Sequence, residues 1–332
     1  MLPTLASTLT VENHLPPDFI ARTLRQDVAT GLTAAAKWLP PRWFYDDRGS
    51  ELFDQITRLP EYYPTRAERE ILRARAAEIA VGSQAETLVE LGAGSAEKTG
   101  LLIEALRAAG TLRGYVPVDV SDAALRTAAA GLLWEYPGLA VHAVVADFER
   151  HLELLPSTGH RMVVLLGGTI GNLVPADRAR FLSAVRAALR PGETFLLGTD
   201  LVKSPDVLVP AYDDAAGVTA DFNRNVLRVL NRELGADFDP DEFDHVAVWD
   251  AEHEWIEMRL RARQDQLVAI PAIELEVRFA SGEEVRTEIS AKFRRGGVAA
   301  ELRAAGFEPT QWWTDEAGRF GVSLATALSG QP

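Results

Sequence analysis

The stretch 88-LVELGAGSAEKTG-100 decides the fold class of this 332-residue chain, because it passes from an apolar run into a glycine-containing turn. Its glycines are Gly92 and Gly94, and it ends in Lys98-Thr99. Strand, turn and helix in this order are typical of three kinds of site: a dinucleotide site, a phosphate-cradling P-loop, or a nucleoside site. Each requires different residues elsewhere, so the neighbouring segments discriminate among them.

Glu97 argues against the first two sites. A P-loop requires a glycine directly before its lysine; Gly92 and Lys98 have the right spacing, but Glu97 fills that position. Its carboxylate would repel phosphates. The dinucleotide motif G-x-G-x-x-G loses its third glycine to the same residue, and that glycine permits close helix packing over a pyrophosphate. A nucleoside without a pyrophosphate therefore fits best.

The segments that follow this turn predict a parallel sheet. Apolar runs alternate with segments of helical apolar spacing. The predicted strands are 87–91, 114–120, 140–147, 162–168 and 194–200, and the predicted helices are 97–110, 121–136 and 176–189. Continuous apolar strands that alternate with helices imply an α/β fold, with a parallel sheet covered on both faces.

Acidic residues end two of these strands, at the edge where open α/β sheets bind ligands. Asp119 ends the second strand, where a carboxylate can accept hydrogen bonds from both hydroxyls of a ribose. Asp147-Phe148 ends the third and suits the amino group and ring face of an adenine. Helix capping is the alternative role for either aspartate. With Glu90 before the glycine turn, the two favour S-adenosylmethionine as the ligand.

The C-terminal segment fits the same interpretation. A predicted helix at 297–306 precedes two predicted strands, 309–315 and 320–328. An antiparallel hairpin of this kind closes the sheet of class I (Rossmann-like) methyltransferases. We therefore predict a class I methyltransferase sheet.

The pattern changes after Asp200, which predicts a second domain. A polar helix at 213–235 and strands at 254–262, 273–280 and 284–290 replace the alternation, and the last two strands, separated by 281–283, resemble a hairpin. We predict a methyltransferase domain of residues 67–202 and 293–332. An α+β substrate-binding domain is expected to combine the N-terminal segment 1–66 with the insertion 203–292.

Composition narrows the expected partners. Lys and Arg number 34 against 48 Asp and Glu, and the resulting formal charge of −14 argues against nucleic acid as a main partner. The chain has no cysteine and its six histidines are scattered, so we expect no metal. The N-terminus does not resemble a signal peptide, and no apolar run approaches the length of a membrane span. We expect a cytoplasmic monomer without a membrane partner.

Several stretches together resemble one family. They are the aromatic run 43-WFYDDRGSELFDQITRLPEYYPTR-66, the turn 90-ELGAGSAEKT-99, 166-LGGTIGN-172, Tyr212, 255-WIEM-258 and 288-EIS-290. The chain resembles the S-adenosylmethionine-dependent L-histidine Nα-methyltransferases of ergothioneine biosynthesis. This resemblance implies three successive methyl transfers to the α-amino nitrogen of L-histidine. The products would be Nα,Nα,Nα-trimethylhistidine (hercynine) and S-adenosylhomocysteine.

The resemblance also implies the residues of the site. On the cofactor side these are Tyr45, Gly92, Gly94, Lys98, Asp119, Asp147 and Phe148. On the histidine side they are Tyr62, Gly167, Thr169, Asn172, Tyr212, Met258, Glu288 and Ser290. Tyr45 and Asn172 are the expected catalytic residues. Asn172 and Tyr212 would hold the amino and carboxylate end, and Tyr62, Met258, Glu288 and Ser290 would surround the imidazole.

Physical chemistry makes these roles reasonable. The attacking nitrogen must be neutral, and the amide of Asn172 can orient its lone pair without stabilising an ammonium as a carboxylate would. Aromatic faces tolerate a growing methylammonium. Glu288 and Ser290 lie two apart on a predicted strand, so they share one face and can both bond an imidazole. Without the resemblance, the tyrosines would indicate core packing, Asn172 a turn, and the Glu288 strand a solvated face.

Two rival functions stay open at this point. The first is methylation of another amine, such as a tryptophan derivative; Glu288 argues against it, because an indole has less use for a buried carboxylate. The second is a non-catalytic S-adenosylmethionine-binding protein that acts as a sensor or partner subunit. An acceptor set in a separate domain argues against that function.

Overall fold

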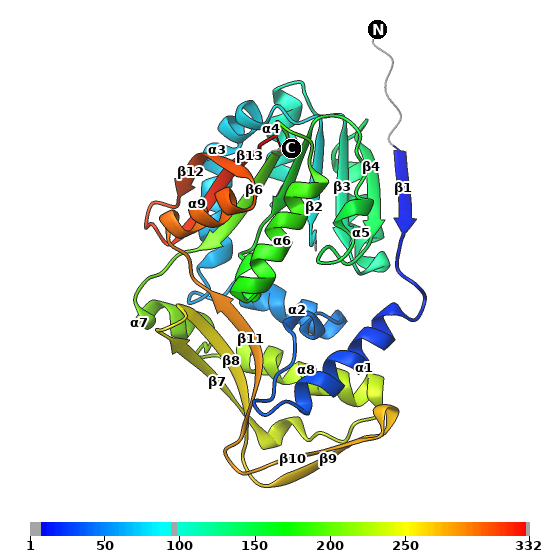
Figure 1. The fold of residues 1–332 in the computed structure, drawn as a ribbon, viewed down its shortest axis with the longest axis vertical. Coiled ribbons are helices and arrows are strands. Elements are labelled where there is room, and N and C mark those ends of the chain that lie inside the picture. The colour runs from blue at the N-terminus through cyan, green and yellow to red at the C-terminus, as the bar shows by residue number, and fades with distance from the viewer. Residues whose placement is uncertain (1–7, 94–97, 330–332) are drawn as a thin grey trace.

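A large eight-stranded sheet forms the centre of the protein, as a computed structural model that describes residues 8–93 and 98–329 shows (Figure 1). Its strand order is β1-β4-β3-β2-β5-β6-β13-β12. The strands are β1 (Thr8–Asn13), β2 (Thr87–Leu91), β3 (Gly114–Asp119), β4 (Ala140–Val145), β5 (Arg161–Leu165), β6 (Thr194–Asp200), β12 (Phe307–Thr314) and β13 (Phe320–Ala327).

The strand directions confirm the predicted fold class. The pairs from β1 through β6 are all parallel, whereas β13 runs antiparallel to both β6 and β12. The five predicted parallel strands and the closing C-terminal hairpin are therefore present in one sheet. This is a class I methyltransferase architecture, and its parallel strands place their carboxyl ends at one edge.

Alternating side chains of the central strands fill two separate cores. Leu88 of β2 packs in one core, with Met162 and Val164 of β5, while Val89 of β2 packs in the other, with Val163. All five residues of β2 are buried. Successive strand residues point to opposite faces, so burial of every residue shows that helices cover both faces.

Helices supply the outer layers of the large sheet. They are α3 (Pro64–Ser83), α4 (Thr99–Ala108), α5 (Asp122–Glu135), α6 (Pro175–Ala188) and α9 (Arg295–Ala304). The first three contribute to one core, and α6 and α9 to the other. The predicted start of α5 is confirmed, since the Ser121 side chain accepts a hydrogen bond from the Ala124 N–H.

A second group of elements lies below the large sheet in Figure 1. Its helices are α1 (Phe19–Leu32), α2 (Asp47–Ile56), α7 (Pro205–Leu208) and α8 (Val218–Leu234). Its strands are β7 (Phe243–Asp250), β8 (Trp255–Ala262), β9 (Gln266–Ile270), β10 (Leu275–Phe279) and β11 (Glu284–Ala291). One core joins side chains from residues 24–63 with side chains from residues 208–285.

The strand pairing in this group corrects one prediction. The segments 273–280 and 284–290 do not pair with each other: β10 pairs with β9, and β11 pairs with β8. Residues 255–291 form one long hairpin in which Arg261 faces Glu284 and Gln266 faces Phe279. Between the pair Arg261–Glu284 and the pair Gln266–Phe279, the two strands are not paired. The predicted turn at 281–283 is therefore a break in this long hairpin and not its tip.

The boundary of the N-terminal segment also differs from expectation. The segment 1–66 was assigned to the substrate-binding domain, but β1 pairs in parallel with β4 at the edge of the large sheet, from Thr8 opposite Ala140 to Asn13 opposite Val145. A polar, largely exposed edge strand carries little hydrophobic signal, which is why the sequence did not reveal it. The remainder of the two-domain division stays a prediction.

The insertion leaves and rejoins the large sheet at neighbouring points. Leu201 forms a parallel bridge with Phe293. The Phe293 N–H donates to the Asp200 carbonyl (2.8 Å), and the Val202 N–H donates to the Phe293 carbonyl (3.0 Å). Both crossings are therefore held together at the carboxyl end of β6.

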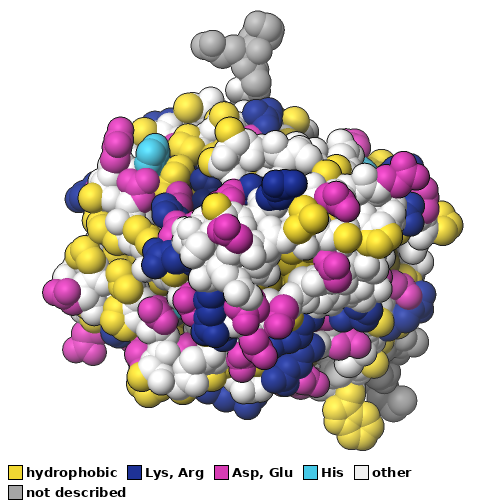
Figure 2. Space-filling model, turned by 90° about the horizontal axis from the view of Figure 1, so that it is seen from below, with side chains coloured by type: hydrophobic (Ala, Val, Ile, Leu, Met, Phe, Trp, Pro, Cys, Tyr) yellow, Lys and Arg dark blue, Asp and Glu magenta, His cyan; other side chains and the backbone are white. Residues whose placement is uncertain are grey.

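The surface mixes charges of both signs. On the face seen in Figure 2, the described Lys and Arg side chains are interspersed with Asp and Glu. Over residues 8–93 and 98–329, no helix has the length and apolar character needed to cross a membrane. Neither observation identifies a partner.

Candidate active site

A cavity of about 1720 Å³ opens at the carboxyl ends of the parallel strands. Its walls combine the ends of β2, β3 and β5 with residues of α2, α8, β8 and β11. Pockets for one small ligand are commonly about 300–1000 Å³. The volume therefore suits two small molecules side by side, as a transfer between them requires.

Most of the site residues implied by the sequence line this cavity. They are Tyr45, Tyr62, Gly92, Lys98, Asp119, Phe148, Gly167, Thr169, Asn172, Tyr212, Met258, Glu288 and Ser290. Gly94 lies outside the described residues. Asp147 does not line the cavity. The structure thus brings together residues from segments more than 200 positions apart.

The glycine turn after β2 forms a slot at the sheet edge, which we call the cofactor end. Gly92 has φ +69°, a conformation that favours glycine, and its N–H donates to the Val118 carbonyl (2.9 Å). A Cβ added at Gly92 would lie 3.4 Å from the Phe148 ring. Phe148 in turn packs edge-on against Phe181, with ring centroids 6.1 Å apart. Asp119, at the end of β3, lines the same end.

The Asp147 carboxylate contacts protein groups beside the cavity. Its Oδ1 accepts a hydrogen bond from the Glu149 N–H (3.0 Å), and its Oδ2 accepts one from Arg42 (3.3 Å). The side chain is buried in these contacts. Because neighbouring residues of a turn point in different directions, Phe148 reaches the cavity while the Asp147 carboxylate holds the turn.

Two buried carboxylates support the cofactor end: Glu90, which the sequence indicated, and Glu68, which it did not. Glu68 of α3 accepts a hydrogen bond from the Gly167 N–H (2.8 Å) and pairs with Lys98. Glu90 accepts hydrogen bonds from Thr99 Oγ1 (2.6 Å) and the Tyr115 hydroxyl. Burial raises the pKa of Glu90 to about 7. These contacts tie the glycine turn, the start of α4 and the 166–172 segment together.

Asn172 lies between the cofactor end and β11. It ends a short 3-10 helix (Thr169–Asn172) that follows Gly168, where φ is +71°. A Cβ on Gly171 would lie 2.9 Å from the Ala291 carbonyl oxygen, so this helix packs directly on β11. Among the described residues the Asn172 amide has no hydrogen-bond partner. It is available to a ligand.

Glu288, Ser290 and Met258 form the opposite wall, which we call the acceptor end. Met258 of β8 faces Glu288 of β11 across the ladder, and a bulge between Arg286 and Glu288 leaves Thr287 without a partner in the ladder. Bulges redirect side chains and are frequent beside active sites. Here the bulge accompanies the placement of Glu288 and Ser290 on the cavity wall.

Glu288 is a carboxylate without a protein partner. Within the part of the chain that the structure describes, no residue donates a hydrogen bond to it. Burial raises its pKa to about 7, although the charge of Lys292 acts in the opposite direction. A carboxylate in this condition can be completed by a ligand that donates a hydrogen bond.

Aromatic rings line the space between the two ends. Tyr45 packs edge-on against Phe53 and Phe222, each with ring centroids 5.5 Å apart. Tyr62 packs edge-on against Tyr212 at 6.4 Å. Tyr45 is 46% exposed even though it lies within this cluster, because it borders the cavity. These rings can surround a cationic nitrogen.

Comparison with known proteins agrees with this geometry. A profile described as "Histidine-specific methyltransferase, SAM-dependent" matches residues 24–327. The chain belongs to this family. The resemblance found in the sequence is confirmed, and the fold and the use of S-adenosylmethionine follow from membership.

Three relatives illustrate the family. A histidine N-alpha-methyltransferase from Mycolicibacterium smegmatis is 59% identical over 96% of this chain and 99% of its own length. One from Mycobacterium tuberculosis is 57% identical, again over 96% and 99%. A protein from Neurospora crassa named ergothioneine biosynthesis protein 1 is 34% identical over 59% of this chain and 23% of its own length.

A charged cluster beneath the acceptor end of this methyltransferase was also missed. It consists of Tyr63, Asp200, Lys203 and Lys292, which come from three separate segments. Its only sequence signal is charge within otherwise apolar segments, and charge alone does not reveal which partners meet. Glu68 was missed for the same reason.

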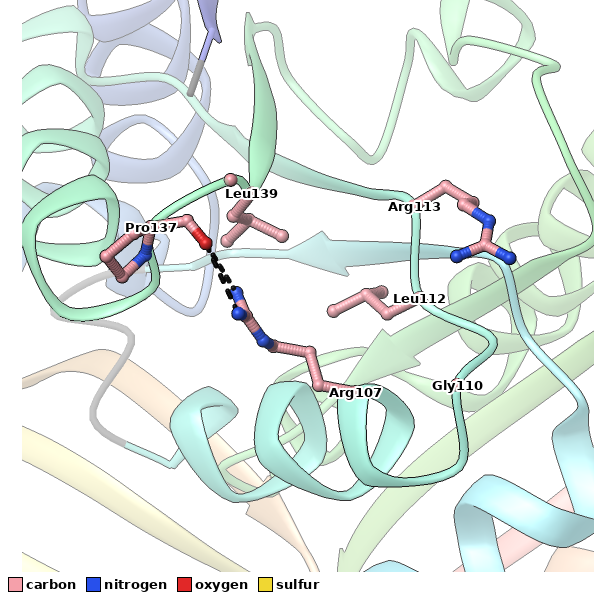
Figure 3. A pocket seen from close by; sticks show the side chains of 7 residues that line it. Arg107, Gly110, Leu112, Arg113, Pro137 and Leu139 are labelled. Atoms are coloured by element: carbon pink, nitrogen blue, oxygen red, sulfur yellow. Dashed lines mark hydrogen bonds between the residues drawn. The ribbon is translucent and has the colours of Figure 1, made fainter. Parts of the chain in front are cut away.

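A second hollow lies away from these residues (Figure 3). Its lining includes Arg107, Leu112, Arg113, Pro137 and Leu139, and Arg107 donates to the Pro137 carbonyl at 3.2 and 3.3 Å. Arg113 directly precedes β3, so this hollow lies at the amino ends of the strands. None of the expected site residues lines it.

Proposed function

We propose that this methyltransferase transfers three methyl groups in succession from S-adenosylmethionine to the α-amino nitrogen of L-histidine. The product is Nα,Nα,Nα-trimethylhistidine (hercynine), an intermediate for ergothioneine. In each round a sulfur–carbon bond breaks and a nitrogen–carbon bond forms. Three molecules of S-adenosylhomocysteine are released, and three protons leave the original ammonium group.

The partnerless Glu288 carboxylate at the acceptor end carries this proposal. It shares its strand face with Ser290 and lies across the ladder from the apolar Met258. An imidazole ring has two polar nitrogens and apolar ring carbons, so it matches a carboxylate, a hydroxyl and a thioether together. An indole would leave part of this set unsatisfied, which disfavours a tryptophan derivative.

The methyl donor fits the cofactor end. The slot formed by Gly92 and Phe148 suits an adenine face, and Asp119 can accept hydrogen bonds from the ribose hydroxyls. Lys98 lines the cavity and can meet the carboxylate of the methionine group, while the buried Glu68 pairs with Lys98 from behind. A sulfonium is already an activated methyl donor, so we propose that no metal takes part.

Alignment of the two substrates is the main catalytic task. Displacement at the methyl carbon requires the amine lone pair in line with the sulfur–carbon bond. Asn172 has a free amide between the two ends and can orient the neutral amine. Tyr45, Tyr62 and Tyr212 provide contacts that persist as each N–H is replaced by a methyl group. We propose that the enzyme acts in the cytoplasm as a monomer.

A mass-spectrometric assay tests the proposal. Purified protein is incubated with S-adenosylmethionine and an equimolar mixture of the twenty amino acids. We expect a gain of three methyl groups on histidine alone, with one S-adenosylhomocysteine per methyl group. Methylation of a different amino acid would overturn the substrate assignment. Tight cofactor binding without any methylated product would favour the sensor alternative.

A further inference from the structure

Lys292 has all its hydrogen-bonding capacity committed beneath the acceptor end. Its side chain is 0% exposed. Its Nζ lies 2.8 Å from the Tyr212 hydroxyl, 2.9 Å from Ser290 Oγ and 3.0 Å from Asp200 Oδ2. A lysine ammonium has three N–H donors and no acceptor. Three acceptors at these distances use all three donors.

Lys292 is charged in this environment. Burial lowers its pKa, but the charge of Asp200 and the hydrogen bonds that Lys292 donates raise it by more, so the net pKa lies above the usual value for lysine. Burial also raises the pKa of Tyr212, so that hydroxyl keeps its proton. Both hydroxyls beside the ammonium therefore accept from Lys292 and retain one hydrogen each.

The number of hydroxyl hydrogens determines whether the Tyr212–Ser290 pair donates or accepts toward a ligand. Tyr212 Oη and Ser290 Oγ lie 2.8 Å apart, and either can be the donor in that contact. One of the two hydroxyl hydrogens is used between them. The other cannot go to the ammonium, and no further acceptor contacts either hydroxyl among the described residues. Both residues line the cavity, so a ligand bound there is in a position to accept the remaining O–H.

We propose that Lys292 is a positioning residue that forces the Tyr212–Ser290 pair to act as a hydrogen-bond donor toward the substrate ring, while Glu288 acts as acceptor. The inference rests on the proposed function, in which that ring is the imidazole of histidine. A neutral imidazole has one N–H and one nitrogen lone pair, and it satisfies both groups. In an imidazolium both ring nitrogens carry an N–H, so one N–H would face the hydroxyl donor and find no acceptor.

The same arrangement of one donor and one acceptor explains why an imidazole is preferred to an indole. An indole offers an N–H but no nitrogen acceptor, so the presented hydroxyl would stay unpaired in a buried site. Sites built to hydrogen-bond a ligand group discriminate strongly against analogues that lack it. Lys292 would therefore contribute to specificity without contacting the substrate.

Matched ring analogues test the inference in the unaltered enzyme. The 4- and 5-thiazolylalanines carry one ring nitrogen with a lone pair and no N–H. The 3- and 2-thienylalanines have the same attachment and replace that nitrogen by carbon. Dissociation constants are measured by calorimetry in the presence of S-adenosylhomocysteine. We expect at least one thiazolylalanine to bind about 10-fold more tightly than its thienyl partner, the size expected for one buried hydrogen bond. Equal affinities for both pairs would overturn the inference.

The variant Lys292→Met then assigns the preference to the ammonium. Asp200 keeps Lys203 (2.6 Å) and the Tyr63 hydroxyl (2.8 Å), so it does not become an unpaired buried charge. The two hydroxyls already bond each other, but without the ammonium their lone pairs are free, so the pair can also accept from a ligand or turn inward and is no longer forced to donate outward. We expect the thiazolyl preference to fall to within about 3-fold, while the affinity for S-adenosylhomocysteine is unchanged.

Lys203→Met is the matched control. Lys203 also contacts Asp200, but it does not contact Ser290 or Tyr212 in the structure. We expect its thiazolyl preference to equal that of the unaltered enzyme. A loss of affinity for thiazolyl and thienyl ligands alike in Lys292→Met would indicate a merely structural lysine and overturn the inference. If the unaltered enzyme methylates histidine but the preference survives in Lys292→Met, only this inference fails and the proposed function stands.

Discussion

The cofactor end and the acceptor end of the cavity are built in different ways. The residues that line the cofactor end come from one stretch of chain, residues 90–172, at the carboxyl ends of neighbouring parallel strands, and Glu68 of α3 supports them from behind. Its shape depends on backbone turns at Gly92 and Gly168, both with positive φ. The acceptor end and the aromatic rings beside it combine side chains from residues 45–62, from Tyr212 and from 258–290. A shared sheet can thus provide the methyl donor site, while side chains far apart in the sequence determine which amine is methylated.

The two ends also differ in how their charges are satisfied. Glu68 and Glu90 at the cofactor end have protein donors for their carboxylates. Glu288 at the acceptor end has none among residues 8–93 and 98–329, and the neighbouring Lys292 has all three donors engaged elsewhere. This partly buried carboxylate lines the cavity, where a ligand can donate to it. The acceptor end is therefore the part whose polar groups are completed by the substrate.

Removal of the Glu288 carboxylate should have the largest effect, and it should impair histidine binding at the acceptor end without impairing cofactor binding. We expect Glu288→Ala to raise the KM for histidine by about 100-fold or more, because an imidazole N–H loses a charged acceptor in a buried site. The Kd for S-adenosylmethionine should stay within about 2-fold, since Glu288 belongs to the other end. Steady-state kinetics and calorimetry measure the two quantities.

Glu284→Ala is the control on the same strand. Glu284 is paired with Arg259 and Arg261 and does not line the cavity. We expect its KM for histidine to match that of the unaltered enzyme. An unchanged KM in Glu288→Ala would remove Glu288 from the imidazole site.

Asn172 lies where the two ends meet, so its loss should affect the transfer step. We expect Asn172→Ala to lower kcat by about 100-fold, the scale of effect that misplacement of a reacting group produces. Cofactor affinity should change much less. Single-turnover measurement of the first methyl transfer separates this step from product release. A variant that transfers methyl groups at the normal rate would refute the amine-orienting role.

Asp119 tests the cofactor end alone. Asp119→Ala should weaken S-adenosylmethionine binding by about 10-fold or more, because the ribose hydroxyls lose a charged acceptor. Asp122→Ala serves as the comparison, since Asp122 is an exposed carboxylate paired with Arg126 within α5. Calorimetric titration of both variants gives the result. Equal affinities in the two variants would contradict the ribose assignment.

The smallest expected effect concerns stability of the ligand-free protein. Burial raises the pKa of Glu288 to about 7 from an ordinary value of 4.5. The carboxyl is neutral in the folded state at pH 5, whereas at pH 8 the fold must hold its charge. The resulting cost grows between pH 4.5 and 7 and is fully present above pH 7. Glu288→Gln should therefore raise Tm by about 2 °C at pH 8 and less at pH 5.

Scanning calorimetry at the two pH values measures this difference. Equal gains at pH 5 and pH 8 would show that the substitution acts through packing and not through charge. Histidine binding by Glu288→Gln, measured in parallel, links the stability gain to the function of the carboxylate. For Glu288→Gln we therefore expect a higher Tm together with a weaker affinity for histidine.

The sequence predicted the large sheet better than the smaller ones, for a physical reason. The strands β2 and β6 begin and end at the predicted residues, because both are buried on two faces and bounded by polar turns. By contrast, β7 and β1 were missed. Most of β7 is only partly buried and β1 is largely exposed, so neither carries a continuous apolar run. The long hairpin of residues 255–291 was misread because local turn signals do not specify register.

The sequence predicted those residues of the candidate site that belong to a motif or to the end of a strand. The resemblance and the strand ends indicated thirteen described residues that now line one cavity. Asp147 does not line the cavity although Phe148 does, because a strand end does not reveal which of two adjacent side chains faces the cavity. Lys292, Asp200 and Glu68 could not be found, since their importance arises from packing between distant segments.

The parallel bridge between Leu201 and Phe293 has a consequence for changes of substrate specificity. Residues 203–292 enter and leave the large sheet side by side, so that segment can be exchanged without moving the strands that hold the methyl donor, as long as its core contacts with residues 24–63 are kept. A graft of the corresponding segment from a relative that methylates another amine would carry Tyr212, Met258, Glu288 and Lys292 together. Substrate range could then evolve, or be engineered, by replacement of one continuous piece of gene.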